Sequence, residues 1–132
     1  MDDWMRRANR FDRPGESFFA ASLNGTLVGI CGLNVDPYVE RQDAEPPAVG
    51  RVRHLYVLST ARGTGVGTAL TRRVIEAARE HFTLLRLSTT NPLAARLYER
   101  LGFEPTTAAH ATHILTLGEP RGSNGLRPDR PR

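Results

Sequence analysis

The chain has 132 residues, of which 39% are hydrophobic and 24% charged, and it carries a formal net charge of +4. This length predicts one domain with one hydrophobic core. No apolar run reaches the length of a membrane span, the start of the chain lacks the apolar segment of a signal peptide, and Cys31, the single cysteine, cannot form an internal disulfide. We therefore expect a cytoplasmic protein that does not engage membranes.

The positive charge is not concentrated in one place. Half of the excess lies in residues 118–132, where four arginines stand against two acidic residues in a segment rich in glycine and proline. That composition predicts a disordered tail after a domain over residues 1–117. The distribution does not favour nucleic acid as a partner.

The first half of the chain predicts a short helix followed by three strands. Trp4, Ala8 and Phe11 repeat at helical spacing, and Asn24-Gly25 supplies the left-handed residues of a hairpin turn. The elements predicted here are a helix over 2–11, strands over 16–23, 26–35 and 49–58, and a loop over 36–48.

The second half predicts helices that alternate with strands. Asn91 is a candidate N-cap, Pro92 suits the first position of a helix, and Gly102 suits the position just after its end. The elements predicted here are a helix from 65 to about 81, a strand over 83–88, a helix that begins at Pro92 and ends at Gly102, and a terminal hairpin with strands over 103–109 and 113–117.

A glycine-rich loop joins the third strand to the first of these two helices. It reads Arg62-Gly63-Thr64-Gly65-Val66-Gly67 and directly follows the strand. Glycines let the backbone approach a bound group closely, and a helix that starts here points unpaired N–H groups at that group. Together with the Arg62 guanidinium, the loop predicts a site for a phosphate or pyrophosphate.

Two common kinds of phosphate loop do not fit this pattern. An NTPase loop needs a lysine before its serine or threonine, whereas Gly67 is followed directly by Thr68 and the chain contains no lysine. A dinucleotide-binding loop needs an acidic residue about 20 positions further on, where residues 83–87 read Thr-Leu-Leu-Arg-Leu. Neither pattern predicts the function here.

A third pattern matches at two places in the chain. Arg62-x-x-Gly65-x-Gly67, directly after the strand, resembles the acetyl-CoA-binding motif of the GNAT superfamily of N-acetyltransferases. The segment from Asn91 through Tyr98 to Gly102-Phe103 resembles the second motif of that family, one helix and one strand later. The resemblance covers about residues 16–117. It implies a single α/β (α+β) domain with a mixed, mostly antiparallel sheet whose central strands splay apart, flanked by helices.

The resemblance also implies an activity, transfer of an acetyl group from acetyl-CoA to a primary amine of a small molecule, peptide or protein, and it assigns roles to residues. Backbone groups of the strand would pair with the pantetheine arm, N–H groups of the loop would hold the pyrophosphate, and one side chain would contact the pantetheine. Those residues are Leu55, Tyr56 and Val57 on the strand, Arg62, Gly63, Thr64, Gly65, Val66, Gly67 and Thr68 in the loop, and Asn91.

The resemblance makes Tyr98 the general acid, because the departing CoA thiolate needs a proton and a phenol at close range can give one. Many members of the family carry a basic carboxylate on the strand before the loop, but residues 50–56 contain none. His54 is one candidate base. Loop carboxylates at Glu40, Asp43 and Glu45, or ordered water, are the alternatives.

Several readings stay open at this level. Family members begin with a further strand and helix that this chain lacks, so a CoA-binding module without turnover is one alternative and a toxin-like or tRNA-directed acetyltransferase is another. An uncovered sheet edge makes a homodimer plausible. His110 and His113 have metal-pair spacing, but their flanks hold no further ligand, so we expect no metal.

Overall fold

The computed structural model describes residues 15–39 and 48–119. The predicted helix over 2–11, most of the 36–48 loop and nearly all of the C-terminal tail lie outside the described residues. The described elements are β1 (Ser17–Leu23), β2 (Thr26–Val35), β3 (Val49–Val57), the 3-10 turn η1 (Ser59–Ala61), α2 (Val66–Arg79), β4 (Leu84–Leu87), α3 (Pro92–Arg100), β5 (Glu104–Pro105) and β6 (His113–Thr116).

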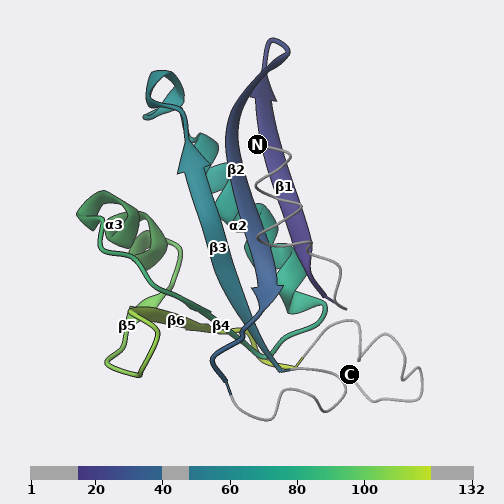
Figure 1. Cartoon of the computed structure of the whole chain (residues 1–132), viewed down its shortest axis with the longest axis vertical. Helices are drawn as coiled ribbons and strands as arrows, with labels where there is room; N and C mark the ends of the chain where they lie inside the picture. Colours follow the sequence, from purple (N-terminus) through teal and green to yellow (C-terminus); the bar gives the residue numbers. More distant parts are fainter. Residues whose placement is uncertain (1–14, 40–47, 120–132) are drawn as a thin grey trace.

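These strands form one sheet in the order β1-β2-β3-β4-β6-β5 (Figure 1). Only β3 and β4 run parallel; all other neighbours are antiparallel. The connection from β3 to β4 therefore needs a crossover, which α2 supplies. The predicted mixed, mostly antiparallel sheet with flanking helices is confirmed.

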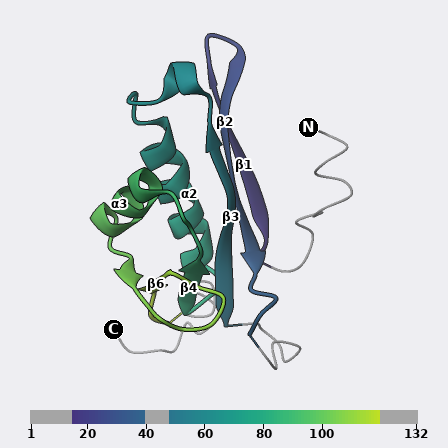
Figure 2. The same cartoon turned by 60° about the vertical axis from the view of Figure 1, so that its left-hand side comes forward.

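Both helices lie on the same side of the sheet, with α2 running along it (Figure 2). The core fills the space between α2 and the sheet, and its fully buried side chains include Leu33, Val74, Phe82 and Leu85. Cys31 of β2 is also fully buried. The buried residues of α2 form one stripe at helical spacing, as the amphipathic pattern of the sequence predicted. Burial of this stripe against the sheet stabilises the helix.

Strand β3 has two features that shape the functional site. It pairs with β4 only over Val49–Arg51 and then continues to Val57 with no strand partner on that side, so the two strands diverge above Arg51. In its pairing with β2, Tyr56 lies opposite Ile30 and Arg53 lies opposite Gly32. Two residues of β3 between these pairs therefore lie opposite one residue of β2. This β-bulge bends the strand at the divergence.

The terminal hairpin is shorter than the sequence predicted. Its first strand covers Glu104–Pro105, because proline cannot donate to the ladder and the Thr106 hydroxyl accepts the Ala108 N–H to start a turn. The predicted strand over 103–109 is therefore wrong beyond Pro105. Within the described residues, no helix is long and apolar enough to cross a membrane.

Candidate active site

A cleft of about 550 Å³ opens where β3 separates from β4. Its three walls are the end of β3, the glycine-rich loop with the start of α2, and one face of α3. The lining residues are Leu55, Tyr56, Val57, Ala61, Arg62, Gly63, Gly65, Gly67, Thr68, Asn91, Leu93, Ala94, Leu97 and Arg100. The structure thus brings nine of the residues predicted to bind the cofactor into one cleft.

The loop presents backbone N–H groups to this cleft. Gly65 is the N-cap of α2 and has φ +89°, and the first intrahelical bond runs from the Ala69 N–H to the Gly65 carbonyl. The preceding N–H groups of the first turn have no carbonyl to pair with inside the helix, and the helix dipole adds partial positive charge. The arrangement suits an anion of phosphate type.

Backbone geometry favours glycine at two positions of the loop. Gly63 and Gly65 both have positive φ, and a Cβ built at either position would meet no protein atom within 4 Å. The space in front of them is therefore open to a ligand. Arg62 lies beside it, with its Nε donating to the Val57 carbonyl at 3.1 Å.

Two predicted loop residues do not line the cleft. Val66 is buried, and its side chain lies where a Cβ on Gly29 would be, so it packs against β2. The Thr64 hydroxyl donates to the carbonyl of Ala61 and closes the turn. For Val66 the backbone N–H remains for the predicted contact with a pyrophosphate, whereas the Thr64 N–H already donates to the Ala61 carbonyl at 3.3 Å.

Asn91 begins α3, as predicted. Its Oδ1 accepts the N–H groups of Leu93 at 2.8 Å and Ala94 at 3.3 Å, and Pro92 occupies the first helical position. The capping bonds use the amide oxygen, so the amide nitrogen is left as the donor that this side chain can offer to the cleft.

One face of α3 was missed as part of the site. Leu93, Ala94, Leu97 and Arg100 line the cleft at helical spacing. Leu93 is 69% exposed, and on the facing strand Tyr56 is 51% exposed, so the cleft offers large apolar surfaces from both walls. The signal in the sequence was the i, i+4, i+7 repeat of Leu93, Leu97 and Arg100 on a face other than that of Tyr98.

Tyr98 lies one layer behind this lining. It is 5% exposed and packs against Phe103, with ring centroids 5.5 Å apart, and against His113 at 6.5 Å. Burial, with a smaller contribution from Cys31, raises the pKa of the phenol above its ordinary value. Within the described residues its hydroxyl makes no hydrogen bond, so the phenol keeps its proton at neutral pH and has it free to donate.

His54 lies in the β3 bulge with φ +62°, a conformation that histidine adopts more readily than most residues. Burial and then Arg53 lower its pKa below 6.5, so the ring is neutral at pH 7 and able to accept a proton. It is not among the residues that line the cleft. The alternative bases at 40, 43 and 45 lie outside the described residues.

Comparison with known proteins decides the family. The family model described as "Acetyltransferase (GNAT) family" matches residues 1–103, which is most of the chain. The chain belongs to the GNAT family.

Individual members of the family resemble the chain over different spans. A mycothiol acetyltransferase from Parafrankia sp. (strain EAN1pec) is 36% identical over 136 residues, covering 92% of this chain and 40% of that protein. A crystal structure of a candidate acetyltransferase from Exiguobacterium sp. 255-15 is 29% identical with a TM-score of 0.73, covering 88% of this chain and 72% of that one. The yncA protein of Salmonella typhimurium, solved with its cofactor acetyl-CoA, has the same fold at 19% identity and a TM-score of 0.67, covering 89% and 72%.

The chain spans less than half the length of the first curated relatives it matches, N-acetylaspartate synthetases and mycothiol acetyltransferases. The shared part contains the acetyltransferase fold.

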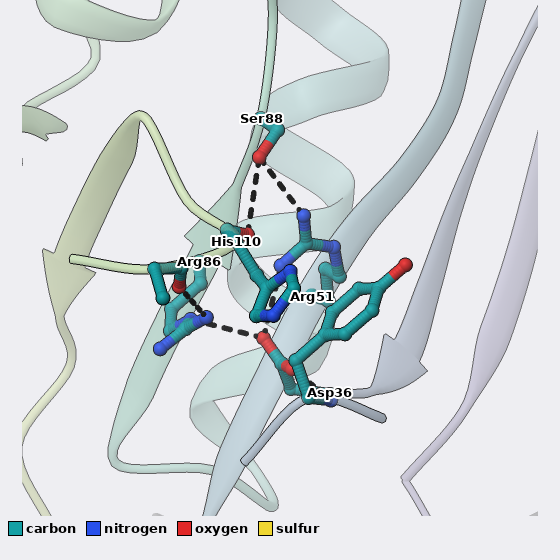
Figure 3. A network of polar contacts seen from close by, with 7 residues as sticks. Asp36, Arg51, Arg86, Ser88 and His110 are labelled. Atoms are coloured by element: carbon teal, nitrogen blue, oxygen red, sulfur yellow. Dashed lines mark hydrogen bonds and ion pairs between the residues drawn. The ribbon is translucent and has the colours of Figure 1, made fainter. Parts of the chain in front are cut away.

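A buried ion cluster closes the lower end of the diverging strands in this GNAT domain (Figure 3). Asp36 Oδ2 lies 3.2 Å from Arg51 Nη1 and 3.1 Å from Arg86 Nε, and all three side chains are at most 13% exposed. Arg51 donates onward to the Ser88 hydroxyl at 3.0 Å, which in turn donates to the His110 carbonyl. The cluster ties the last residues in which β3 and β4 pair, so it fixes where the strands part.

This cluster was not predicted, because its members are 15 or more positions apart and the arginines read as ordinary strand residues. The ring of Tyr38 stacks on that of His110 at 4.4 Å and lies over the Arg51 guanidinium at 4.9 Å. His113, the other histidine of the dismissed metal pair, contacts Glu99 and Thr112 instead. No group of metal-binding side chains occurs among residues 15–39 and 48–119.

Proposed function

We propose that this chain transfers an acetyl group from acetyl-CoA to a primary amine of a small molecule or a peptide. The observation that carries the proposal is the cleft between β3 and α3, closed at one end by the N–H groups of the glycine loop. A phosphate-binding end joined to a long groove with exposed apolar walls fits a ligand with a pyrophosphate and an extended arm.

The donor would bind along β3. N–H groups from Arg62 to Thr68 would hold the pyrophosphate, and the open space at Gly63 and Gly65 leaves room for it. The arm would lie along Leu55, Tyr56 and Val57, where β3 has no strand partner on the cleft side. The Asn91 amide nitrogen would donate to a carbonyl of the arm. The acetyl-CoA bound to yncA supports this choice of donor.

In the reaction, the amine nitrogen attacks the thioester carbon, a C–N bond forms, and the C–S bond breaks. The sulfur leaves with the bonding electrons and takes the phenolic proton of Tyr98, while the amine loses a proton to a base. His54, neutral at pH 7, is our candidate for that base, directly or through water. The phenol regains its proton from solvent after CoA leaves.

One observation favours a second function, CoA binding without turnover. Tyr98 stands behind the cleft lining, and residues 50–57 of β3 offer no carboxylate. If a ligand does not bring the phenol into contact with its sulfur, the site would hold CoA and do no chemistry. A toxin-like or tRNA-directed acetyltransferase is a further alternative, which rests on the positive charge and on the lack of a basic carboxylate in β3.

The acceptor, the compartment and the assembly are also proposals. The relatives are named for different acceptors, so they do not choose one for this chain. We propose a cytoplasmic site of action. A homodimer would pair through β1, which is an edge strand of the described sheet.

The test is CoA release from acetyl-CoA across a panel of amines, together with thermal melting in the presence of acetyl-CoA, NAD and ATP. Transfer to at least one amine and stabilisation by acetyl-CoA alone are expected. Stabilisation by acetyl-CoA with no release from any amine would replace the enzyme with the binding module. A larger shift with NAD or ATP would contradict both.

A further inference from the structure

A chain of hydrogen bonds runs from one end of α3 to the other and passes through β6. His113 Nε2 donates to Glu99 Oε2 at 2.8 Å, and its Nδ1 lies 2.9 Å from the Thr112 hydroxyl oxygen. That oxygen accepts the Thr89 N–H at 3.1 Å, and the Thr89 hydroxyl oxygen accepts the Asn91 N–H at 3.1 Å. Glu99, at one end of this chain of hydrogen bonds, is next to Tyr98 in the sequence. Asn91, at the other end, is the N-cap of α3.

Polar anchors matter for α3 because the helix buries little apolar surface. Tyr98 is the only buried residue among those of α3. Leu93 and Leu97 line the cleft, and Ala94 both lines the cleft and packs, partly buried, against the core. A helix with one buried side chain gains little from apolar packing, so polar contacts at its ends decide where it sits.

His113 is well placed to transmit position to the phenol. Its ring is 5% exposed, is held at both nitrogens, and lies 6.5 Å from the Tyr98 ring, centroid to centroid. A carboxylate can only accept, so Nε2 carries a proton and donates to Glu99, while the Thr112 hydroxyl holds Nδ1 on the other side of the ring. Both partners are then satisfied, and the ring cannot turn without losing one of them.

We propose that His113 and Glu99 are positioning residues for Tyr98, fixing the phenol where it can protonate the leaving thiolate. Neither touches the reacting atoms. This inference rests on the proposed function, because it needs Tyr98 to be the acid. In the sequence, His113 was considered only as half of a metal pair that was then dismissed, and the contact with Glu99 indicates a different role.

The consequence is a selective loss of kcat. Small misplacement of a catalytic group is costly, so losing the anchor should lower kcat about tenfold. The loop and β3 remain in place, so the KM for acetyl-CoA should stay within about twofold of wild type, because those contacts are made elsewhere.

The test compares His113→Phe and Glu99→Ala in the full chain, in wild-type and Tyr98→Phe backgrounds, by steady-state CoA release. His113→Phe keeps a ring against Tyr98 and removes both hydrogen bonds. His113→Gln should recover part of kcat, since its amide can donate to Glu99. Glu104→Ala is the matched control: the same change at an exposed residue on β5, expected to leave kcat unchanged.

Non-additivity decides the outcome. If His113 and Glu99 act through the phenol, their substitutions lower kcat in wild type and have no further effect once Tyr98 is phenylalanine. An equal loss in both backgrounds, or a raised KM with unchanged kcat, overturns the inference. If His113→Phe does not fold, Glu99→Ala and His113→Gln carry the same comparison.

The failures are distinguishable. Tyr98→Phe at the wild-type rate would overturn the acid role and this inference with it. A slow Tyr98→Phe beside wild-type rates for both His113→Phe and Glu99→Ala would overturn only the positioning role and leave the proposed acid in place.

Discussion

The environments of Tyr98 and His54 move their pKa values in opposite directions. Burial raises the pKa of the phenol and lowers that of the imidazole, so each keeps at neutral pH the proton state that its proposed role needs. Pairs of groups pushed apart in this way are typical of acid–base catalysis. Tyr98 was identified from a sequence motif, and His54 was a candidate because the strand carries no carboxylate. The burial of the two side chains could not be predicted from the sequence, because burial depends on the packed fold.

These shifts predict the pH profile. A base must be neutral, so kcat/KM should rise with pH through a pKa below 6.5 and be flat by pH 7, because His54 is then deprotonated. The raised pKa of Tyr98 keeps the alkaline side flat beyond the ordinary pKa of a phenol. Steady-state rates from pH 5 to about 11 measure the acidic limb and the flat alkaline side.

His54→Asn is the matching variant, because asparagine tolerates the left-handed backbone of the bulge. It should lower kcat/KM about 10²-fold and abolish the acidic limb. An acidic limb that is unchanged in the variant would show that another group, such as a loop carboxylate, is the base.

At the scale of elements, the N-cap residue of α3 has a structural role and, in the proposed function, a binding role as well. Asn91 caps the helix with its amide oxygen and faces the cleft. The cap could be predicted from the order Asn-Pro at the start of an apolar repeat, whereas the cleft-lining face of the helix could not, since nothing local shows which face meets β3. The end of β5 was also not predictable from local sequence. Pro105 indicates that a strand ends nearby, but the turn at Thr106 determines the residue at which β5 ends.

Two substitutions should separate the roles of Asn91. Asn91→Ser keeps a capping oxygen and loses the amide nitrogen, so stability should hold while the KM for acetyl-CoA rises several-fold. Asn91→Ala loses both and should also cost about 1 kcal/mol of unfolding free energy. Urea denaturation and steady-state kinetics measure the two effects, and equal KM values for Asn91→Ser and wild type would remove the amide from the binding site.

At the scale of the whole molecule, the Asp36 cluster joins the end of β2, β3, β4 and the loop before β6 (Figure 3). The order of helices and strands along the chain followed from the sequence pattern, and the mixed, mostly antiparallel sheet from the family resemblance. This cluster did not, because ion pairs between distant strands leave no periodic signal. It lies where β3 and β4 stop pairing, so it supports the divergence that makes the cleft.

Asp36→Asn should destabilise the fold by about 3–5 kcal/mol, because two buried guanidinium groups would lose their carboxylate. Replacing the surface-exposed Glu76, which pairs with Arg79 on α2, by glutamine should cost less than about 1 kcal/mol. Urea titration of both variants gives the comparison. Similar small losses would mean that the cluster does not hold the strands together.

The central claim is that the glycine loop and the β3–α3 cleft bind acetyl-CoA, and calorimetric titration of two matched variants tests it most directly. Gly65 and Gly25 both have positive φ, and a Cβ at either meets no protein atom within 4 Å, but only Gly65 lines the cleft. Asparagine tolerates this backbone, so both variants should fold. We predict that Gly65→Asn lowers acetyl-CoA affinity at least about 10²-fold, by filling the space for the pyrophosphate, while Gly25→Asn binds as wild type does. Unchanged affinity in Gly65→Asn would contradict the account.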